Sequence, residues 1–362
     1  MADLGTTAPY YAARPRLFVD GEEVTGLEQG LIALCVEETT SGLFSCEATF
    51  GNWGSRGEDL DYLYFDRERF DFGKPLAVVM GDGDAEAAIF EGRITALEGK
   101  YPRGRSPELR VLAEDRCQDL RMVRRTRTFE DVGDGDVFER IAGDHGLRPE
   151  IDVDGPTYRT LAQVNQSDLA FLRDRARAID AEVWVEGDAL FAQARSRRRA
   201  GADVTLTYGE GLRELCLSAD LAHQRTRLAV GGWDIGAKAG IEEEVAEEAI
   251  SGELAGGSSG IQVLSDSFGD RPERLVHSVP LSSEEARAIA ESQMRATARR
   301  FVSGHGVAEG DARLKVATHV EVAGLGPLFD GAYYVCAVRH QFGPQGFRST
   351  FEVERPALGR AA

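Results

Sequence analysis

Two pairs of aspartates have the residue type and spacing that acid–base chemistry requires. Asp82 and Asp84 flank one glycine, and Asp134 and Asp136 flank another. Two carboxylates held close together are the machinery of a glycoside hydrolase, so a glycan-cleaving, lysozyme-like enzyme is the alternative function. Aspartate beside glycine is also the usual composition of a turn, and the sequence favours that structural role for both pairs.

Metal-binding and cofactor motifs are the next candidates. Segment 81–84 offers the oxygen ligands that calcium prefers, but no acid-spaced loop of the EF-hand type follows it. The five cysteines include no C-x-x-C pair, and the six histidines form no H-E-x-x-H motif. The sequence therefore predicts reduced, buried cysteines and no catalytic residue, metal or cofactor. A metal site or a Cys–His pair would have to be assembled from distant segments.

Two arginine-rich segments, 121–127 and 195–199, are the candidates for binding a polyanion. The whole chain has 42 basic and 61 acidic residues, a net charge of −19, which repels nucleic acid and anionic lipid on average. We therefore expect these arginines to be solvated or to pair with acids of a neighbouring copy. No sequence-specific nucleic-acid partner is predicted.

The apolar segments are too short for a membrane span. The longest, 31–36 and 76–80, fall far below the ~20 residues of a transmembrane helix. The N-terminus lacks the apolar core of a signal peptide. We expect synthesis in the cytoplasm and no membrane partner.

Residues 15–116 are predicted to form a β-domain. Short apolar or alternating segments are separated by glycine- and proline-containing turns, which is typical of an antiparallel barrel or sandwich. The expected strands are 17–19, 31–37, 43–50, 76–79, 87–95 and 109–113.

Residues 117–200 are predicted to form an inserted α+β module. Segment 136–139 has capping-box spacing, which predicts a helix that starts there and stops at Gly146. Ser167 is expected to cap a second helix, and a hairpin turning at 187–188 follows.

The remaining strands are predicted to form a second β-domain from 201–237 and 303–358. The insertion at 238–302 carries an acidic flap and a helix that begins at the capping box 282–285.

Within this insertion, segment 241–249 is acidic and compatible with a helix, and segment 255–260 has the composition of a flexible linker. The flap is expected to be solvated; a docking segment for a partner is the alternative.

Two hairpin-like segments share residues at an offset of 239. The aligned residues are Phe90, Gly92, Gly104 and Arg116 in the first and Phe329, Gly331, Gly343 and Arg355 in the second. Each pattern predicts a strand, a turn that needs glycine, and a returning strand. Their similarity indicates an α+β, mostly β protein with two related antiparallel barrel-like domains. Chance similarity between two ordinary hairpins is the alternative.

Three segments carry a resemblance to a known family. They are VFERIAGDHGL, then YRTLAQVNQSDLAFLRDRARAIDAEVWVEGDALFAQA, and the C-terminal GLGPLFDGAYYVCAVRHQF followed by GFRSTFEVER. The most specific part is 163–171, with Ser167, Asp168 and Phe171, and the last block places His340 near the end of its strand. From about residue 15 to 356 the chain resembles the phage late control D proteins and the N-terminal hub of VgrG-type spike proteins.

The resemblance implies a structural protein, not an enzyme. It would be the homotrimeric baseplate hub of a contractile tail or injection system, part of a phage-tail-like particle. Two tube-like β-domains per chain would give six units around a central channel, adapting the hexameric inner tube to the trimeric spike.

The implied partners are an inner tube or tube-initiator protein at one end, a spike at the other, and baseplate wedge proteins. The sequence ends at Ala362, straight after the hub-like ending, so we expect the spike to be a separate polypeptide. Phage tail, tailocin and injection system all fit the sequence.

Overall fold

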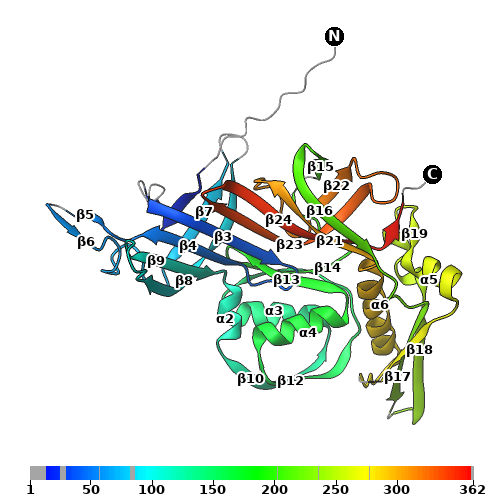
Figure 1. Cartoon of the computed structure of the whole chain (residues 1–362). Coiled ribbons are helices and arrows are strands. Elements are labelled where there is room, and N and C mark those ends of the chain that lie inside the picture. The colour runs from blue at the N-terminus through cyan, green and yellow to red at the C-terminus, as the bar shows by residue number, and fades with distance from the viewer. Residues whose placement is uncertain are drawn as a thin grey trace.

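The computed structural model describes residues 14–24, 30–56, 58–81, 86–201, 203–234, 236–276 and 278–359. One sheet of 13 strands runs through both β-rich parts, and two smaller parts pack below it (Figure 1). None of the helices in these ranges is long and apolar enough to cross a membrane.

Seven strands make the N-terminal half of the large sheet. In spatial order they are β2 (Glu22–Glu23), β1 (Arg16–Val19), β7 (Pro75–Met80), β8 (Ala87–Lys100), β9 (Glu108–Glu114), β4 (Ser45–Gly51) and β3 (Leu31–Thr39). Buried residues alternate along them, as in β9, where Leu109, Val111 and Ala113 face the core. A separate hairpin of β5 (Gly54–Arg56) and β6 (Asp59–Asp61) extends from one end.

Six strands make the C-terminal half and close into a barrel. In spatial order they are β23 (Gly331–Gly343), β22 (His319–Ala323), β15 (Val204–Tyr208), β16 (Gly211–Ala219), β21 (Val302–Glu309) and β24 (Gly346–Arg355). The barrel closes because β23 pairs with both β22 and β24. β23 also pairs with β3 through residues 337–342, which joins the two halves.

The fold class is therefore α+β and mostly β, as predicted. One detail differs, since β15 lies parallel to both of its neighbours and the barrel is not purely antiparallel. Among the described strands of the N-terminal half, no pairing closes a second barrel.

Residues that follow β9 form the α+β module around a core of its own. Its elements are α2 (Cys117–Arg121), β10 (Arg124–Val132), α3 (Asp134–Asp144), β11 (Arg148–Asp152), β12 (Tyr158–Ser167), α4 (Asp168–Ala178), β13 (Ala181–Glu186) and β14 (Ala189–Ala194). Three short-range predictions are confirmed. Ser167 Oγ caps α4 by accepting the Ala170 N–H at 3.2 Å, β13 and β14 turn at 187–188, and Gly146 follows α3 with φ +61°.

The start of α3 differs from the prediction. The N-cap is Gly133, and Asp136 is the third helical residue, whose carboxylate accepts the Gly133 N–H at 2.8 Å. Asp136 thus takes the place of the capping-box acid and not of the N-cap, because a carboxylate can serve either end of that motif, and the glycine N-cap supplies no reciprocal side-chain bond.

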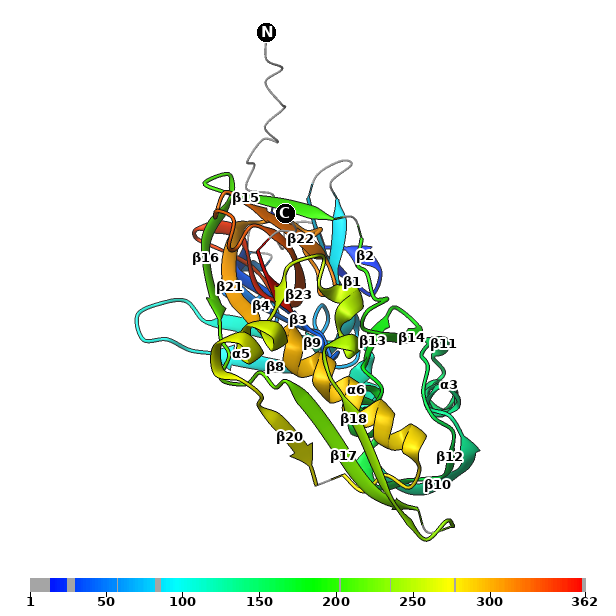
Figure 2. The ribbon, with the colours of Figure 1, turned by 90° about the vertical axis from the view of Figure 1, so that its right-hand side faces the viewer.

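The insertion is built around α6 (Ser283–Arg299), which Ser282 caps as predicted by accepting the Glu285 N–H at 3.1 Å. The other elements are β17 (Arg227–Asp234), β18 (Ala239–Val245), η2 (Glu247–Ala249), η3 (Ser251–Glu253), β19 (Ser258–Ser259), α5 (Gly260–Phe268) and β20 (Pro272–Leu275). β19 pairs with β25 (Ala357–Leu358). Figure 2 shows α6 lying between the β17–β18–β20 sheet and the module. Among the described strands β17 pairs only with β18 and β20, so it belongs here and not to the second β-domain.

The expected acidic flap is a packed structure. β18 is a strand and not a helix, because Ile241 and Val245 are buried against α6 while Glu242 is exposed. The linker-like segment is ordered as well. Ser259 caps α5, and a Cβ on Gly260 would lie 2.5 Å from the Phe301 ring, so only glycine fits there.

Candidate functional site

Segment 163–171 gathers polar groups around one buried carboxylate. Asp168 is 1% exposed, and one of its oxygens accepts hydrogen bonds from Arg127 and Gln163, each at 2.8 Å. The other oxygen lies 2.8 Å from His145 Nε2. Burial alone would raise the pKa of Asp168, but the bonds from His145 and Gln163 and the charge of Arg127 hold it below its usual value. The carboxylate therefore ties α4 to β10, β12 and the end of α3.

Phe171 completes this segment from the apolar side. Its ring stacks on Phe129 of β10 with centroids 5.9 Å apart, inside the module core. The predicted residues Ser167, Asp168 and Phe171 thus lie close together, and they connect α4 to its neighbouring elements within the module.

The two predicted hairpins both form, but with different registers. Residues 101–107 join β8 to β9, whereas only 344–345 join β23 to β24. An offset of 239 would place Tyr333 opposite Glu352, but Glu352 pairs with Ala337. The two segments have equal length, but the first has the longer loop and the second has the longer paired strands.

The aligned glycines serve different purposes. A Cβ on Gly92 would lie 2.3 Å from a backbone carbonyl oxygen, whereas Gly331 has φ +131°. Gly104 has φ +78° in its loop, as a turn glycine should. Gly343 is a paired strand residue, and Gly346 with φ +84° makes the second turn, which corrects that alignment.

The aligned ends of the hairpins are more alike. Arg116 donates to the carbonyl oxygen of His145 at 3.1 Å, and Arg355 donates to that of Asp330 at 3.0 Å. Phe90 is buried in the first core, and Phe329 packs half-buried against the second.

His340 lies where the two halves of the sheet meet. His340 is 1% exposed and is paired with Val36 of β3 in the sheet. Its Nδ1 lies 2.8 Å from Ser349 Oγ. Its Nε2 is buried without a hydrogen-bond partner. Burial lowers the pKa of His340 to about 4, so the ring is neutral at physiological pH.

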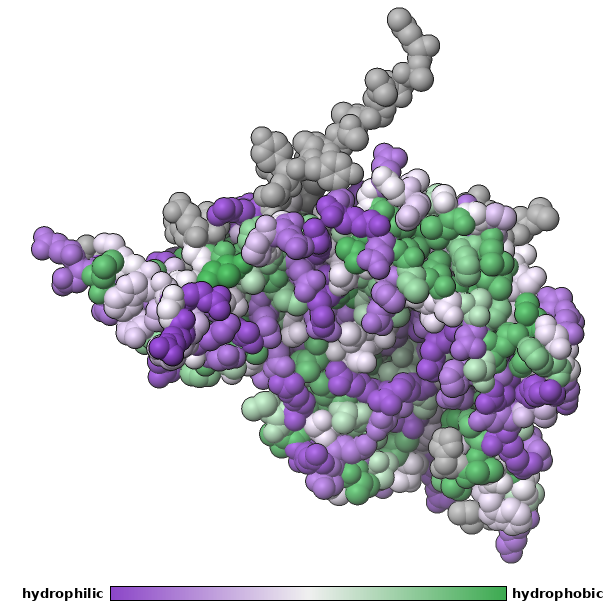
Figure 3. All heavy atoms as spheres, in the orientation of Figure 1, coloured by the Kyte–Doolittle hydropathy of each residue, from purple (hydrophilic) through white to green (hydrophobic). Residues whose placement is uncertain are grey.

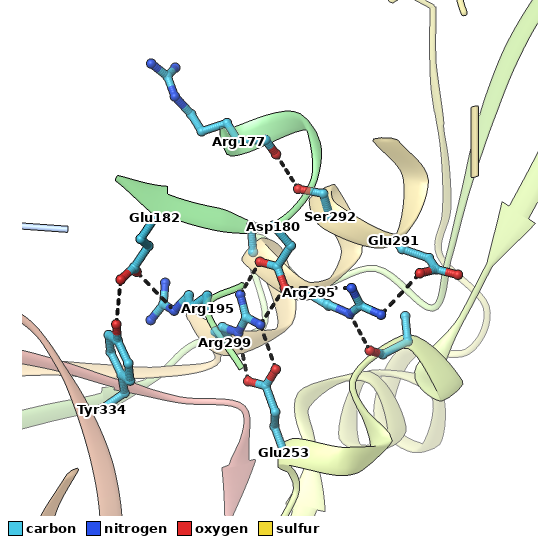
Figure 4. A network of polar contacts seen from close by, with 12 residues as sticks. Arg177, Asp180, Glu182, Arg195, Glu253, Glu291, Ser292, Arg295, Arg299 and Tyr334 are labelled. Carbon is cyan, nitrogen blue, oxygen red and sulfur yellow. Dashed lines mark hydrogen bonds and ion pairs between the residues drawn. The ribbon is translucent and has the colours of Figure 1, made fainter. Parts of the chain in front are cut away.

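A network of arginines and acids joins the module, the insertion and the barrel (Figure 4). Arg299, the last residue of α6, is 3% exposed and donates to Asp180 at 2.7 Å and to Glu253 at 2.6 Å. Asp180 lies in the turn between α4 and β13, and Glu253 lies in η3. Burial alone would lower the pKa of Arg299, but its bonds to Glu253 and Asp180 raise it above the usual value.

A second centre of this network binds the module to the barrel. Glu182 of β13 accepts from Arg198 at 2.7 Å and from the Tyr334 hydroxyl of β23 at 2.6 Å. Arg195 pairs with Glu354 of β24, and its guanidinium lies 4.3 Å from the centre of the Tyr334 ring. Burial and the charge of Glu182 raise the pKa of Tyr334, so its hydroxyl stays protonated as a donor.

Arginines of both predicted basic segments are bound within the chain. Arg127 of the first pairs with Asp168, and Arg198 of the second pairs with Glu182. Arg127 and Arg198 are therefore not simply solvated, whereas Arg121, Arg124 and Arg197 remain exposed as expected. The acids come from other elements and reach the arginines only through the tertiary fold.

The network forms a wall of a cleft of about 1200 Å³ between the three parts. The lining includes Arg197 of the module, Glu291 of the insertion, and Tyr333 and Arg355 of the barrel. Figure 3 shows mainly hydrophilic side chains where the large sheet meets the module and the insertion. Charges of both signs line the cleft, and many of them are paired with each other. The lining therefore acts mainly to hold the three parts of the chain together through polar contacts.

The predicted carboxylate pairs do not make an acid–base site in the described residues. Asp134 is buried and pairs with Arg175 at 2.6 Å, while Asp136 caps α3. Asp82 and Asp84, and with them the calcium-loop candidate, lie outside the described residues.

Sequence reasoning missed one enzyme-like motif. Segment 256–260 matches the G-x-S-x-G pattern of a nucleophile elbow, and α5 begins at its last glycine, although the two-residue strand β19 lies within the segment and no strand leads into it from 254–257. In the described part of the chain, however, Ser258 forms no side-chain hydrogen bond to a histidine, and Ser259 is used to cap α5. No group of three His, Cys, Asp or Glu residues in these ranges is placed to hold a metal.

Sequence reasoning also missed the network residues Arg299, Asp180 and Glu182. Arg299 is 119 residues from Asp180, and Tyr334 is 152 residues from Glu182. The one local signal is that Arg299 follows Ala298, a small residue on the inward face of α6.

The fold is shared with phage tail proteins. The chain is similar to the 43 kDa tail protein of prophage MuSo2 from Shewanella oneidensis, at 14% identity and a TM-score of 0.68, covering 96% of this chain and 99% of that one. The tail protein from Neisseria meningitidis MC58 gives 14% identity, a TM-score of 0.64, and 95% and 97% coverage. An E. coli component of the type VI secretion system, itself similar to the T4 tail proteins gp27 and gp5, is 13% identical with a TM-score of 0.54. That match covers 96% of this chain and 79% of the E. coli chain. These likenesses define the fold.

The family follows from the sequence. Residues 54–343 match the family model of the Alg8 N-terminal domain, so the chain belongs to that family. The matching model is thus not the late control D family that the sequence resembles. No curated protein matches the chain in sequence.

Proposed function

We propose that this protein is the structural hub of a contractile tail or injection-system baseplate. The observation that carries the proposal is the end-to-end likeness to a tail protein, which covers 96% of this chain and 99% of that one. The likeness to a type VI secretion component extends the same fold to injection systems. The proposed role is to form a channel and to adapt a hexameric inner tube to a trimeric spike.

The proposed assembly is a homotrimer. Residues 15–116 are one tube-like unit, and the closed barrel from 201–226 and 302–358 is the other, so three chains would supply six units. The module and the insertion, with β17 assigned to the latter, would lie outside this ring. The proposed partners are a separate spike protein, an inner tube or tube-initiator protein and baseplate wedge proteins, within a tail-like particle assembled from cytoplasmic protein.

The oligomeric state tests this proposal. Light scattering of the protein alone should give a mass of three copies of the 39.4 kDa chain, and its complex with a co-expressed spike protein should contain three copies of this chain. A monomer or a hexamer in the spike complex would contradict the adaptor role. The same samples should release no reducing ends from peptidoglycan, and hydrolysis would favour the glycan-cleaving alternative.

A further inference from the structure

Four aromatic rings form a continuous row at the end of the N-terminal half. Trp53 lies 5.2 Å from Tyr62, Tyr62 lies 5.0 Å from Phe65, and Phe65 lies 5.9 Å from Tyr101, measured between ring centroids. The row connects the base of the β5–β6 hairpin to the loop between β8 and β9. We call these four residues the aromatic row.

The two ends of the row are exposed, while Tyr62 and Phe65 between them are partly buried and Phe65 packs against the first core. Trp53 is 44% exposed and Tyr101 is 64% exposed, and Leu60 of the adjoining β5–β6 hairpin is more than half exposed as well. Large apolar side chains that gather on a surface mark an interaction site, and Trp and Tyr are the residues that most often anchor one.

The loop that presents Tyr101 is basic. Residues 100–107 contain Lys100, Arg103 and Arg105 and no acid. Arg103 and Arg105 are exposed and form no ion pair within the described part of the chain. The partner of this end of the molecule should therefore be both apolar and acidic.

The far end of the same molecule has those two properties. Trp233, Val276, Val279 and Leu281 are each more than half exposed, and we call them the insertion patch. Trp233 and Val279 lie close together, since their neighbours Gly232 and Pro280 are in contact. Segment 239–285 around the patch contains eleven acids and only two arginines. Five of these acids are bound in ion pairs within the chain, and the segment remains net negative when their arginine partners are counted; the five are Glu242, Glu244, Glu253, Asp270 and Glu273.

We propose that the aromatic row of one copy docks on the insertion patch of the next copy. The proposal rests on the proposed trimer and names its contact surface. β5 and β6 lie at one end of the molecule and β17 and β18 at the other (Figure 1). A contact between two different patches on opposite ends is heterologous, and it closes a ring when the rotation between copies is right. Contact between two identical rows would instead bring basic loops 100–107 together.

Photo-crosslinking tests which surface the row touches. Tyr101 is replaced by benzoylphenylalanine in heavy-isotope protein, which is mixed with light wild-type protein before assembly. Mass spectrometry should find crosslinks between position 101 of a heavy chain and residues 233–281 of a light chain. The same replacement at Tyr208, which is equally exposed at the end of β15, is the control and should not reach that segment. Crosslinks from position 101 to any other segment overturn the proposal.

Truncation of the rings tests the strength of the contact. Trp53→Ala combined with Tyr101→Ala should raise the concentration for half-assembly at least tenfold, while Tyr208→Ala leaves it unchanged. If the double variant trimerises like the wild type, the proposed contact is wrong and the hub remains. If the wild-type protein forms no trimer with its spike, the proposed function fails, and this contact fails with it.

Discussion

At the scale of single residues, the most informative side chain is His340, because its charge is excluded by its surroundings. The ring is buried between the two halves of the sheet, with one nitrogen on Ser349 and the other without a partner. Among the described residues no carboxylate lies within ion-pair distance of the ring. Burial and the charge of Lys315 lower its pKa to about 4, against the opposing effects of the Leu314 backbone and the charge of Asp311.

This burial predicts an acid-sensitive stability. The unfolded chain binds a proton on His340 near pH 6.5 and the folded chain near pH 4, so stability is full above 6.5 and falls as the pH drops through this window. The loss from this group should reach about 3 kcal/mol at pH 4. Urea unfolding between pH 4 and 7 should show it, and His340→Phe should flatten the slope. His223→Gln, at an exposed site, should leave the slope intact; an unchanged slope in His340→Phe would refute the assignment.

Gly331 carries a second prediction at this scale. Its φ of +131° disfavours any side chain, and a Cβ would lie 2.9 Å from the Arg355 guanidinium. Gly331→Val should therefore lower the free energy of unfolding by about 1–3 kcal/mol. Gly343→Val is the matched control, since that glycine has open space and no left-handed φ. Equal melting temperatures for both variants and the wild type would show that the backbone argument is wrong.

At the scale of elements, α6 is the member that ties the insertion to the module. Arg299 at its end holds Asp180 and Glu253, and Ser292 donates to the Arg177 carbonyl oxygen at the end of α4. These contacts fix the wall of the cleft, so the position of α6 decides the position of the insertion patch.

Removing the positive charge of Arg299 at the end of α6 should lower the free energy of unfolding substantially. Arg299→Met removes the ion-pair partner of Glu253 and leaves Asp180 with the more distant Arg295, at 3.8 Å. Breaking a buried pair in this way costs about 3–5 kcal/mol. Arg300→Met, at an exposed neighbouring residue whose one side-chain bond within the described ranges goes to the Ala296 carbonyl oxygen, should cost far less. Chemical denaturation of both variants measures the difference, and hydrogen exchange should show the loss concentrated in 247–268. Equal stability of the two variants would contradict the proposed tie.

At the scale of the whole molecule, the main question is where the large negative net charge lies on the assembled trimer. A trimer would carry 3 × −19 = −57. Many arginines are bound within the chain, as in the module and at the cleft, so they do not offset this charge at the surface. Part of the negative charge lies in the insertion, and the remainder is available to the channel.

We expect the channel wall to be polar and net acidic. Such a wall repels a passing polyanion from all sides, and salt screens the repulsion over ~8 Å at physiological strength. A cryo-electron microscopy structure of the hub with its spike would show which strands face the channel. A net basic or apolar wall would contradict this expectation without affecting the trimer.

The sequence by itself determined the features that depend on neighbouring residues. The Ser167 and Ser282 caps, the turn at 187–188 and the glycine after α3 all follow from side chains that satisfy backbone groups a few residues away. Strand-rich composition likewise predicted the mostly β class. The same local logic erred where one residue fits two roles, as for Asp136, or where burial outweighs composition, as in β18.

Only the tertiary structure decided which distant residues meet. The pairing of β23 with β3, the parallel β15 and the assignment of β17 to the insertion depend on contacts between distant segments, and Phe342 and Leu34 are 342 − 34 = 308 residues apart. The Arg299 and Glu182 networks arise in the same way. A buried charge needs a partner of opposite sign, and the chain supplies that partner from whichever element folding brings close, so its position along the sequence carries no signal.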